Sequence, residues 1–334
     1  MINIISKSYL SKKTSGPKKV VENLIKGLDK IGYPYCINKS LDSTSQLWIH
    51  DDAKALRKAS ELGLKAVVGP NIYILPRNIH GDINLDNFLY IHPSKWAEEF
   101  WEDFGFDRCK LDFWPTGIDT EIFKERETPK DGEVLIYFKQ RSEEELSFIK
   151  DKLKNKGIKF SVIKYGEYVE KDYIKKIKNS KYIIWLGGQE SQGIALQEAL
   201  SMNVPILVWD VKNVGDWVPR KNELHIFNEE ELKYENTSSA YYFDGNCGIK
   251  FKDRKDFDEK LEIMEQNYTK LNPRKYIINN LNLKKQAIDF VNLFEEHLGI
   301  KYEDGLNEEI KNNKDWVNNS FYYRLIQNVK DLLR

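Results

Sequence analysis

The chain has little cysteine. Only three occur among its 334 residues, namely Cys36, Cys109 and Cys247. They are far apart, form no CxxC pair and have no histidine beside them, which excludes a disulfide framework and a zinc site of the usual spacing. A few scattered cysteines are typical of a reducing compartment, so we expect a cytoplasmic protein.

The chain also lacks an excess of charge of either sign. Its 52 Lys and Arg residues balance 52 Asp and Glu residues, so the formal net charge is zero. Without a long-range field, neither nucleic acid nor an anionic membrane is an expected partner, and an anion would need a local cluster of Lys, Arg and backbone amides. The sequence therefore predicts a small-molecule partner.

Long apolar runs are absent as well. The opening MINIISKSYLSKK is interrupted too early for a signal peptide, and no later stretch approaches the roughly 20 apolar residues of a membrane span. We therefore expect no transmembrane segment. The aromatic, Lys-rich stretch 308–334 is expected to be a solvated amphipathic helix, with a peripheral membrane contact as the alternative.

The composition is globular, with 41% apolar and 13% aromatic residues. The length suits two domains better than one, because single cores divide within this size range. Short β-branched and aromatic runs alternate with longer amphipathic ones, which predicts an α/β fold with parallel sheets. In the first half we expect helices over 18–31, 53–62 and 94–104, between strands at 2–6, 35–38, 47–50, 65–68, 88–92 and 111–114.

The periodic pattern breaks at FKERETPKDG, residues 123–132, where charge, Pro and Gly take over. We place a linker at 125–132, between a first domain of residues 1–124 and a second of 133–299, and expect a helical extension over 300–334. In the second domain we expect strands at 134–138, 160–163, 182–186 and 205–209, with helices over 142–155, 169–179 and 191–202. Beyond Phe251 the pattern is helical, and these helices should close the second domain or cross back to the first.

The most informative segment is KYIIWLGGQESQGIALQEALSMNVPILVWD, residues 181–210, which predicts a strand, a small-residue loop, a helix and another strand. Free amides and the dipole at a helix N-terminus favour a bound anion, and Gly188 and Gly193 let a ligand approach the backbone. Glu190 lies at the mouth of this helix and Glu198 eight residues later, a rise of roughly 12 Å that suits a sugar diphosphate. Taken singly, these are ordinary solvated Glu and packing Gly residues, but their combination favours a phosphate site.

Two Glu residues with seven between them, after a strand and around a Gly, resemble the signature of the family 4 glycosyltransferases (glycosyl transferases group 1). TSGPKKVVENLIKGLDKIG, residues 14–32, is similar to the family's glycine loop and first helix. HPSKWAEEFWEDFGF and WPTGIDTEIF, within residues 92–123, are similar to its passage toward the linker. The resemblance implies a GT-B fold, with two Rossmann-like domains facing a central cleft and extra C-terminal helices. It also implies a retaining transferase that uses a nucleoside diphosphate sugar.

The resemblance assigns roles to residues of this sequence. Glu190 would contact hydroxyls of the donor sugar, Glu198 would hold the ribose, and amides around Gly193 would hold the diphosphate. Lys139 and Arg141 would stabilise the departing diphosphate, although the family usually spaces such residues more widely, and the alternative is ordinary surface charge. The other expected donor contacts are Gly16, Tyr165, Gly166, Gly188, Gln189, Ser191, Gln192, Ile194 and Ala195.

The acceptor is expected on the first domain, where His50, Asp51 and Asn71 follow predicted strands and face the presumed cleft. Many relatives carry a His near the position of Asn71. An amide there can bind a sugar hydroxyl but cannot act as a base. His80, with Asp82, is an alternative source of a titrating group.

The implied mechanism has the acceptor attack on the face from which the diphosphate leaves, with a phosphate oxygen taking the proton. It requires no metal or other cofactor, and no DxD motif follows a predicted strand. Domain closure over the donor is expected. Residues 239–251, SAYYFDGNCGIKF, resemble a subset of bacterial and viral surface-glycan transferases, so the acceptor is expected to be a glycan or a similar hydroxyl compound.

Two other functions fit the same sequence. One is another enzyme of this fold, an epimerase or a phosphorylase, and the other is a catalytically silent module that binds sugar nucleotides. A Rossmann oxidoreductase is disfavoured, because no GxGxxG motif follows the first strand. Nucleobase, sugar, acceptor, linkage and oligomeric state depend on pocket shape, which the motifs do not give.

Overall fold

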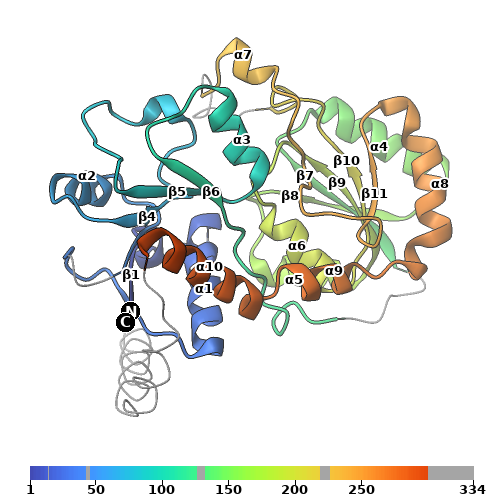
Figure 1. Ribbon diagram of the computed structural model, residues 1–334. Coiled ribbons are helices and arrows are strands. Elements are labelled where there is room, and N and C mark those ends of the chain that lie inside the picture. Colours follow the sequence, from blue (N-terminus) through green and yellow to red (C-terminus); the bar gives the residue numbers. More distant parts are fainter. Residues whose placement is uncertain (14, 43–45, 126–131, 219–225, 300–334) are drawn as a thin grey trace.

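The computed structural model describes residues 1–13, 15–42, 46–125, 132–218 and 226–299. They form two parallel sheets with flanking helices, arranged side by side (Figure 1). The predicted α/β class is thereby confirmed. The expected helix at 300–334 lies outside the described residues, as does most of the predicted linker.

The first sheet has the strand order β2-β1-β3-β4-β5-β6. Four of its strands, β1, β3, β4 and β5, are buried along their whole length, as expected of apolar runs in a parallel sheet that is covered on both faces. The observed bounds agree with the six predicted strands within one residue at each end: β1 (Ile2–Ile5), β2 (Tyr35–Ile37), β3 (Gln46–Ile49), β4 (Ala66–Val68), β5 (Phe88–His92) and β6 (Lys110–Phe113).

Three helices connect these strands: α1 (Gly16–Ile31), α2 (Ala53–Glu61) and α3 (Lys95–Asp103), with 3-10 turns η1 (Ser8–Leu10) and η2 (Pro76–Asn78). Helix α1 begins where the Ser15 side chain accepts a hydrogen bond from the amide of Lys18, and Pro17 lies in its first turn. It ends at Gly32, whose φ of 69° is left-handed. The sequence predicts that Gly16 and Pro17 open this helix ahead of the periodic stretch 18–31, and the structure confirms that start.

The second sheet has the order β11-β10-β9-β7-β8. Its elements are β7 (Glu133–Lys139), α4 (Glu143–Asn155), β8 (Phe160–Lys164), α5 (Glu170–Lys178), β9 (Ser180–Gly187), α6 (Ile194–Ser201), β10 (Ile206–Trp209), α7 (Glu229–Leu232) and β11 (Gly248–Phe251). Strand β11 was not predicted, because its four residues show no clear periodicity. It pairs with β10 at Gly248, where a Cβ atom would lie 2.0 Å from the carbonyl oxygen of Ile206.

The predicted start of the helix at Ser191 is wrong. Helix α6 begins at Ile194, after Gly193 with a φ of 82°. This left-handed residue cannot continue a helix, so Glu190, Ser191 and Gln192 belong to the preceding loop. The helical rise computed between Glu190 and Glu198 therefore does not apply, and only Glu198 lies on the helix.

The chain after β11 is helical, as predicted, with η3 (Arg254–Asp256), α8 (Phe257–Asn267), η4 (Tyr268–Lys270), α9 (Pro273–Asn280) and α10 (Leu283–Leu298). Helix α10 crosses back and lies along α1 (Figure 1). The approach is close, since a Cβ atom on Gly27 would lie 2.6 Å from the carbonyl oxygen of Leu283 and 2.8 Å from the Cβ of Ala287. Residues 283–298 thus complete the first domain, although the predicted boundaries assign them to the second.

Each sheet has an apolar cluster on either face. In the first domain, the buried Trp48 packs against α10, with its ring centroid 4.9 Å from that of Phe290. The indole of Trp114 donates a hydrogen bond to the carbonyl of Gln286 at 2.8 Å. Within the part of the chain that the structure describes, no helix has the length and apolar character needed to cross a membrane.

Candidate functional site

A lysine and a glutamate meet where the second sheet ends. Lys139 is the last residue of β7, and Glu190 lies in the loop after the neighbouring strand β9. The Nζ of Lys139 is 2.5 Å from Oε1 of Glu190, and the two side chains are only 17% and 13% exposed. The same ammonium lies 4.6 Å from the ring centroid of Tyr165, beyond the end of β8. Three predicted site residues are therefore in contact, although the sequence separates them by at least 25 positions.

Hydrogen bonds from both domains hold the backbone of the loop that carries Glu190. The amide of Glu190 donates to the carbonyl of Ser238 at 3.0 Å, and its carbonyl accepts from the indole of Trp96 at 3.1 Å. Trp96 lies in α3 of the first domain and was not among the predicted site residues. Its only sequence signal was an aromatic residue early in a predicted helix, which is usually a core position.

A buried polar cluster holds the backbone on either side of this loop. Asp210, directly after β10, accepts hydrogen bonds from the hydroxyl of Ser238 at 2.9 Å and the amide of Ser239 at 2.6 Å. The Ser239 hydroxyl donates to the carbonyl of Gly187 at 3.1 Å, and the ammonium of Lys250 lies 3.6 Å from Asp210. Because buried polar groups need partners, this network fixes the loop that precedes Glu190. The sequence signal for Asp210 was a carboxylate ending an apolar strand.

Arg141 is buried and has several partners. Its guanidinium pairs with Glu145 and donates to the carbonyls of Gly187 at 3.3 Å and Trp209 at 3.4 Å. Its side chain is 4% exposed. These contacts join the ends of β7, β9 and β10, so Arg141 acts on the site through the backbone of its neighbours in this arrangement.

The second glutamate of the spaced pair also holds a lysine. Glu198 lies on α6, and its Oε1 is 2.5 Å from the Nζ of Lys19 on α1 in the first domain. The same ammonium is 2.6 Å from Oε2 of Glu170, at the start of α5. Burial raises the pKa of Glu198 to about 7, although Lys19 acts to lower it. Lys19 was not among the predicted site residues.

The raised pKa of Glu198 gives a testable pH dependence. The ordinary value is 4.5, so the folded chain binds this proton more tightly than the unfolded chain does. The resulting stability is fully present below about pH 4.5 and is lost as the pH rises through about 7. We expect the free energy of unfolding of the wild type, relative to that of Glu198→Gln, to fall between pH 5 and pH 8 in urea titrations. Parallel pH profiles for the two proteins would contradict this assignment.

The remaining predicted donor residues differ in their burial and in their contacts. The side chain of Gln192 already has hydrogen-bond partners, since it accepts from the amide of Thr116 at 3.0 Å and donates to that residue's carbonyl at 2.8 Å. These two bonds join the domains. Gly188 packs against Trp217, whereas a Cβ atom on Gly16 would meet nothing within 4 Å, which leaves that backbone open. The others range from exposed to half-buried: Gly166, Gln189, Ser191, Ile194 and Ala195.

Solved structures match this architecture, although no protein-family model and no curated protein matches the chain by sequence. The sucrose-phosphate synthase of Thermosynechococcus elongatus aligns with a TM-score of 0.56, over 90% of this chain and 99% of that one, at 9% identity. The catalytic domain of starch synthase IV from Arabidopsis thaliana, bound to ADP and acarbose, gives 0.55 over 89% and 99%, at 11% identity. The lipopolysaccharide outer core galactosyltransferase WaaB gives 0.52 over 88% and 99%, at 12% identity.

The chain has the GT-B fold. The expectation of this fold is confirmed over nearly the whole length of both chains. The pairs Lys139–Glu190 and Lys19–Glu198 lie on the side of the second domain where the carboxyl ends of its strands face the first domain.

The predicted acceptor residues lie at the strand ends of the first GT-B domain. His50 is fully buried, with Nε2 3.0 Å from the carbonyl of Pro17 and 3.3 Å from Nδ2 of Asn71. Burial lowers its pKa to about 4, so its ring is neutral at pH 7. Asp51 accepts from the amides of Lys7 at 2.7 Å and Ser8 at 2.9 Å, and so fixes the loop after β1. Asn71 is exposed beside His50.

The alternative pair, His80 and Asp82, contacts α2. Asp82 forms an ion pair with the half-exposed Arg57, and His80 lines a shallow hollow with Arg57 and Tyr73. None of the predicted donor or acceptor residues lines that hollow. Among the described residues, no three His, Cys, Asp or Glu side chains are grouped so as to hold a metal ion.

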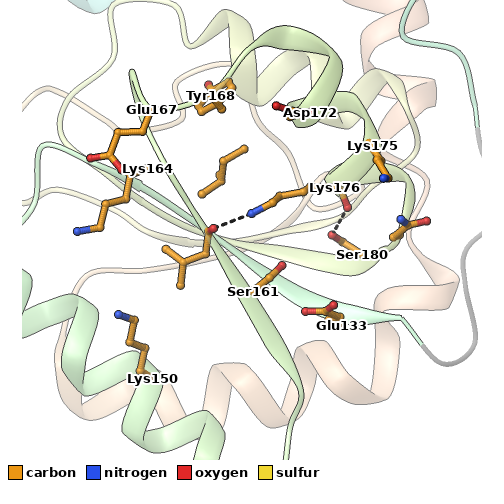
Figure 2. A pocket seen from close by; sticks show the side chains of 13 residues that line it. Glu133, Lys150, Ser161, Lys164, Glu167, Tyr168, Asp172, Lys175, Lys176 and Ser180 are labelled. Atoms are coloured by element: carbon orange, nitrogen blue, oxygen red, sulfur yellow. Dashed lines mark hydrogen bonds between the residues drawn. The ribbon is translucent and has the colours of Figure 1, made fainter.

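A groove of about 660 Å³ runs along the free edge of β8 and against α5 (Figure 2). Its lining mixes lysines with acidic residues, and Lys176 covers the strand edge by donating to the carbonyl of Val162 at 2.9 Å. No predicted site residue lines this groove. Mixed charge and a covered strand edge are typical of a solvated surface that avoids strand pairing. We therefore interpret this groove as solvated surface and not as a ligand site.

Proposed function

We propose that the chain is a glycosyltransferase that moves a sugar from a nucleoside diphosphate sugar to a hydroxyl of a glycan or similar acceptor. The observation that carries this proposal is the Lys139–Glu190 pair beside the N-terminus of α6, within a GT-B fold. A carboxylate that binds sugar hydroxyls, an ammonium and free helix amides are together what a sugar diphosphate needs.

Each part of the donor has a proposed partner. Glu190 accepts hydrogen bonds from the sugar hydroxyls, the amides of Gly193 to Ala195 receive the diphosphate, and Glu198 accepts from the ribose hydroxyls. Tyr165, a residue that is 42% exposed, offers a ring face for the nucleobase. Arg141 holds the strand ends in place and so orients Lys139.

The proposed reaction retains the configuration at the anomeric carbon. The bond from that carbon to the diphosphate oxygen breaks, and a bond to the acceptor oxygen forms on the same face. The acceptor proton passes to the departing diphosphate. Lys139 stabilises the negative charge that grows on the diphosphate, and Glu190 keeps that ammonium beside it. This scheme requires no metal ion.

The acceptor is proposed to bind at His50 and Asn71 on the first domain. Neutral His50 can orient the amide of Asn71 toward a hydroxyl, and neither group needs to act as a base, because the diphosphate accepts the proton. All three cysteines are unpaired, which supports a reducing, cytoplasmic location.

The function is tested by a thermal-shift screen with UDP, GDP, ADP and CMP and their sugar conjugates, with and without divalent metal. A ligand that binds only the native state raises the melting temperature, so one nucleotide class should respond. Proton NMR of the product with an acceptor panel should then show the donor's anomeric configuration. No response to any nucleotide would contradict the proposal. Sugar release to inorganic phosphate, or reaction without an acceptor, would replace it with the phosphorylase or the epimerase.

A further inference from the structure

The two glutamates of the proposed donor site hold lysines from different domains. Glu190 pairs with Lys139 of the second domain, and Glu198 pairs with Lys19 of the first. A nucleoside diphosphate sugar presents its sugar hydroxyls to Glu190 and its ribose hydroxyls to Glu198. Lys139 stays beside Glu190, whereas a ribose that reaches the buried Glu198 takes the place of Lys19. Among the described residues, Lys19 is the one cation of the first domain that pairs with a carboxylate of α6.

The position of Lys19 on its own helix is unfavourable. It lies in the first turns of α1, near the positive end of the helix dipole, and that first turn carries no acidic residue. Its compensation comes from the other domain: burial acts to lower the pKa of Lys19, but Glu198 and Glu170 outweigh this and raise it. The positive end of the α1 dipole disfavours the ammonium of Lys19, and carboxylates of the other domain compensate for this. Such a lysine is suited to bind an anion that enters between the domains.

We propose that Lys19 is a ligand for the donor diphosphate, supplied by the first domain and held by Glu198 and Glu170 until a ribose reaches Glu198. This inference rests on the proposed function and adds a residue and a coupling to its site. Glu198 lies four residues after Ile194, about 6 Å along the helix from the first amides of α6. The flexible four-carbon stem of a lysine can span that distance.

The exchange is balanced because each group that loses a partner gains one or lies in water. Glu198 is 2% exposed, so it cannot lose an ammonium without a replacement, and the ribose hydroxyls supply that replacement. The side chain of Glu170 is 43% exposed and can be left to solvent. Lys19 in turn exchanges two carboxylates for the phosphate oxygens. Recognition of ribose and recognition of diphosphate are thereby coupled through one side chain.

This coupling has a measurable signature. A nucleoside must displace Lys19 from Glu198 without offering the ammonium a new partner, whereas a nucleoside diphosphate offers one. We expect Lys19→Met to raise the Kd for the matching nucleoside diphosphate at least tenfold. The same change should leave the Kd for the nucleoside unchanged or lower it. Isothermal titration of the full-length chain with both ligands measures the two values.

Matched variants separate this role from a purely structural one. Lys18→Met removes the neighbouring lysine, which pairs with Glu22 on the same helix at 3.7 Å, and should change neither Kd. Lys19→Arg should restore most of the diphosphate affinity. Glu170→Gln should leave that affinity unchanged or increase it. If Lys19→Met does not fold, Lys19→Gln keeps a hydrogen-bond donor for Glu198 and takes its place.

Three outcomes overturn the inference. Equal losses for nucleoside and nucleoside diphosphate would make Lys19 a structural latch, and wild-type affinity for both would leave it without a role in binding. If the wild-type chain binds no nucleotide at all, the proposed function itself fails, and the inference fails with it. Selective loss of the diphosphate affinity, in a variant that melts like the wild type, supports it.

Discussion

Replacing Glu190 by Gln is expected to lower kcat by about 100-fold or more, a loss comparable to removal of one transition-state contact in other enzymes. The amide keeps the shape of the side chain but loses the charge that holds the ammonium of Lys139 at 2.5 Å. It also becomes a weaker acceptor for sugar hydroxyls. Initial rates at saturating donor and acceptor, after the donor has been identified by thermal shift, measure the effect.

The lysine of the pair tests whether the two residues act as a unit. Lys139→Met should cost a similar factor, and the double variant Glu190→Gln/Lys139→Met should cost much less than the product of the two, because each single change removes the same interaction. The half-exposed pair of Lys164 and Glu143, 2.8 Å apart, is a matched control, and Lys164→Met should leave the rate unchanged. Wild-type turnover by Glu190→Gln, with an unchanged melting temperature, would remove Glu190 from the site.

Replacing Gly27 by Val is expected to lower the free energy of unfolding by about 3 kcal/mol, as an overpacked core does. On an isolated helix the change would be mildly favourable, because glycine is a poor helix former. Here the added Cβ would lie 2.6 Å from the carbonyl oxygen of Leu283, which belongs to the backbone of α10 and cannot rotate away. The contact between α1 and α10 therefore determines that the substitution lowers the free energy of unfolding. Urea unfolding monitored by tryptophan fluorescence measures the loss.

The control for this prediction lies on the same helix. Lys30 is exposed near the end of α1, so Lys30→Val introduces the same side chain with no neighbour to displace, and should change stability by less than about 1 kcal/mol. If Gly27→Val were as stable as the wild type, the packing of α10 against α1 would be looser than the structure has it.

Most of the fold could be predicted from local pattern. Apolar runs bounded by turn residues located ten of the described strands within two residues, because a strand buried on both faces has a strong composition signal. The failures have local causes that a pattern does not show. At Gly193 a left-handed residue delayed α6, and at Gly248 a glycine allowed a four-residue strand that lacks periodicity.

The candidate site was predictable only where its residues are close in sequence or follow strands of one sheet. Parallel strands bring their carboxyl ends to one edge, and this brought Lys139 and Glu190 together as the sequence suggested, although their roles stay predictions. Lys19 and Trp96 could not be found in this way, because their partners lie 179 and 94 positions away in the other domain. Arg141 was expected to face the ligand, but a sequence does not show that the carbonyls at two neighbouring strand ends will bind a guanidinium.

The return of α10 to the first domain also bears on how the chain is made. Ribosomes deliver the N-terminal residues first, and domains generally begin to fold as they emerge. Here the apolar face of α1 and Trp48, buried by α10 in the finished protein, has no cover until residues 283–298 have been synthesised. Through most of translation the first domain therefore exposes the surface that will later bind α10, and transiently exposed apolar surface of this kind is what chaperones generally cover.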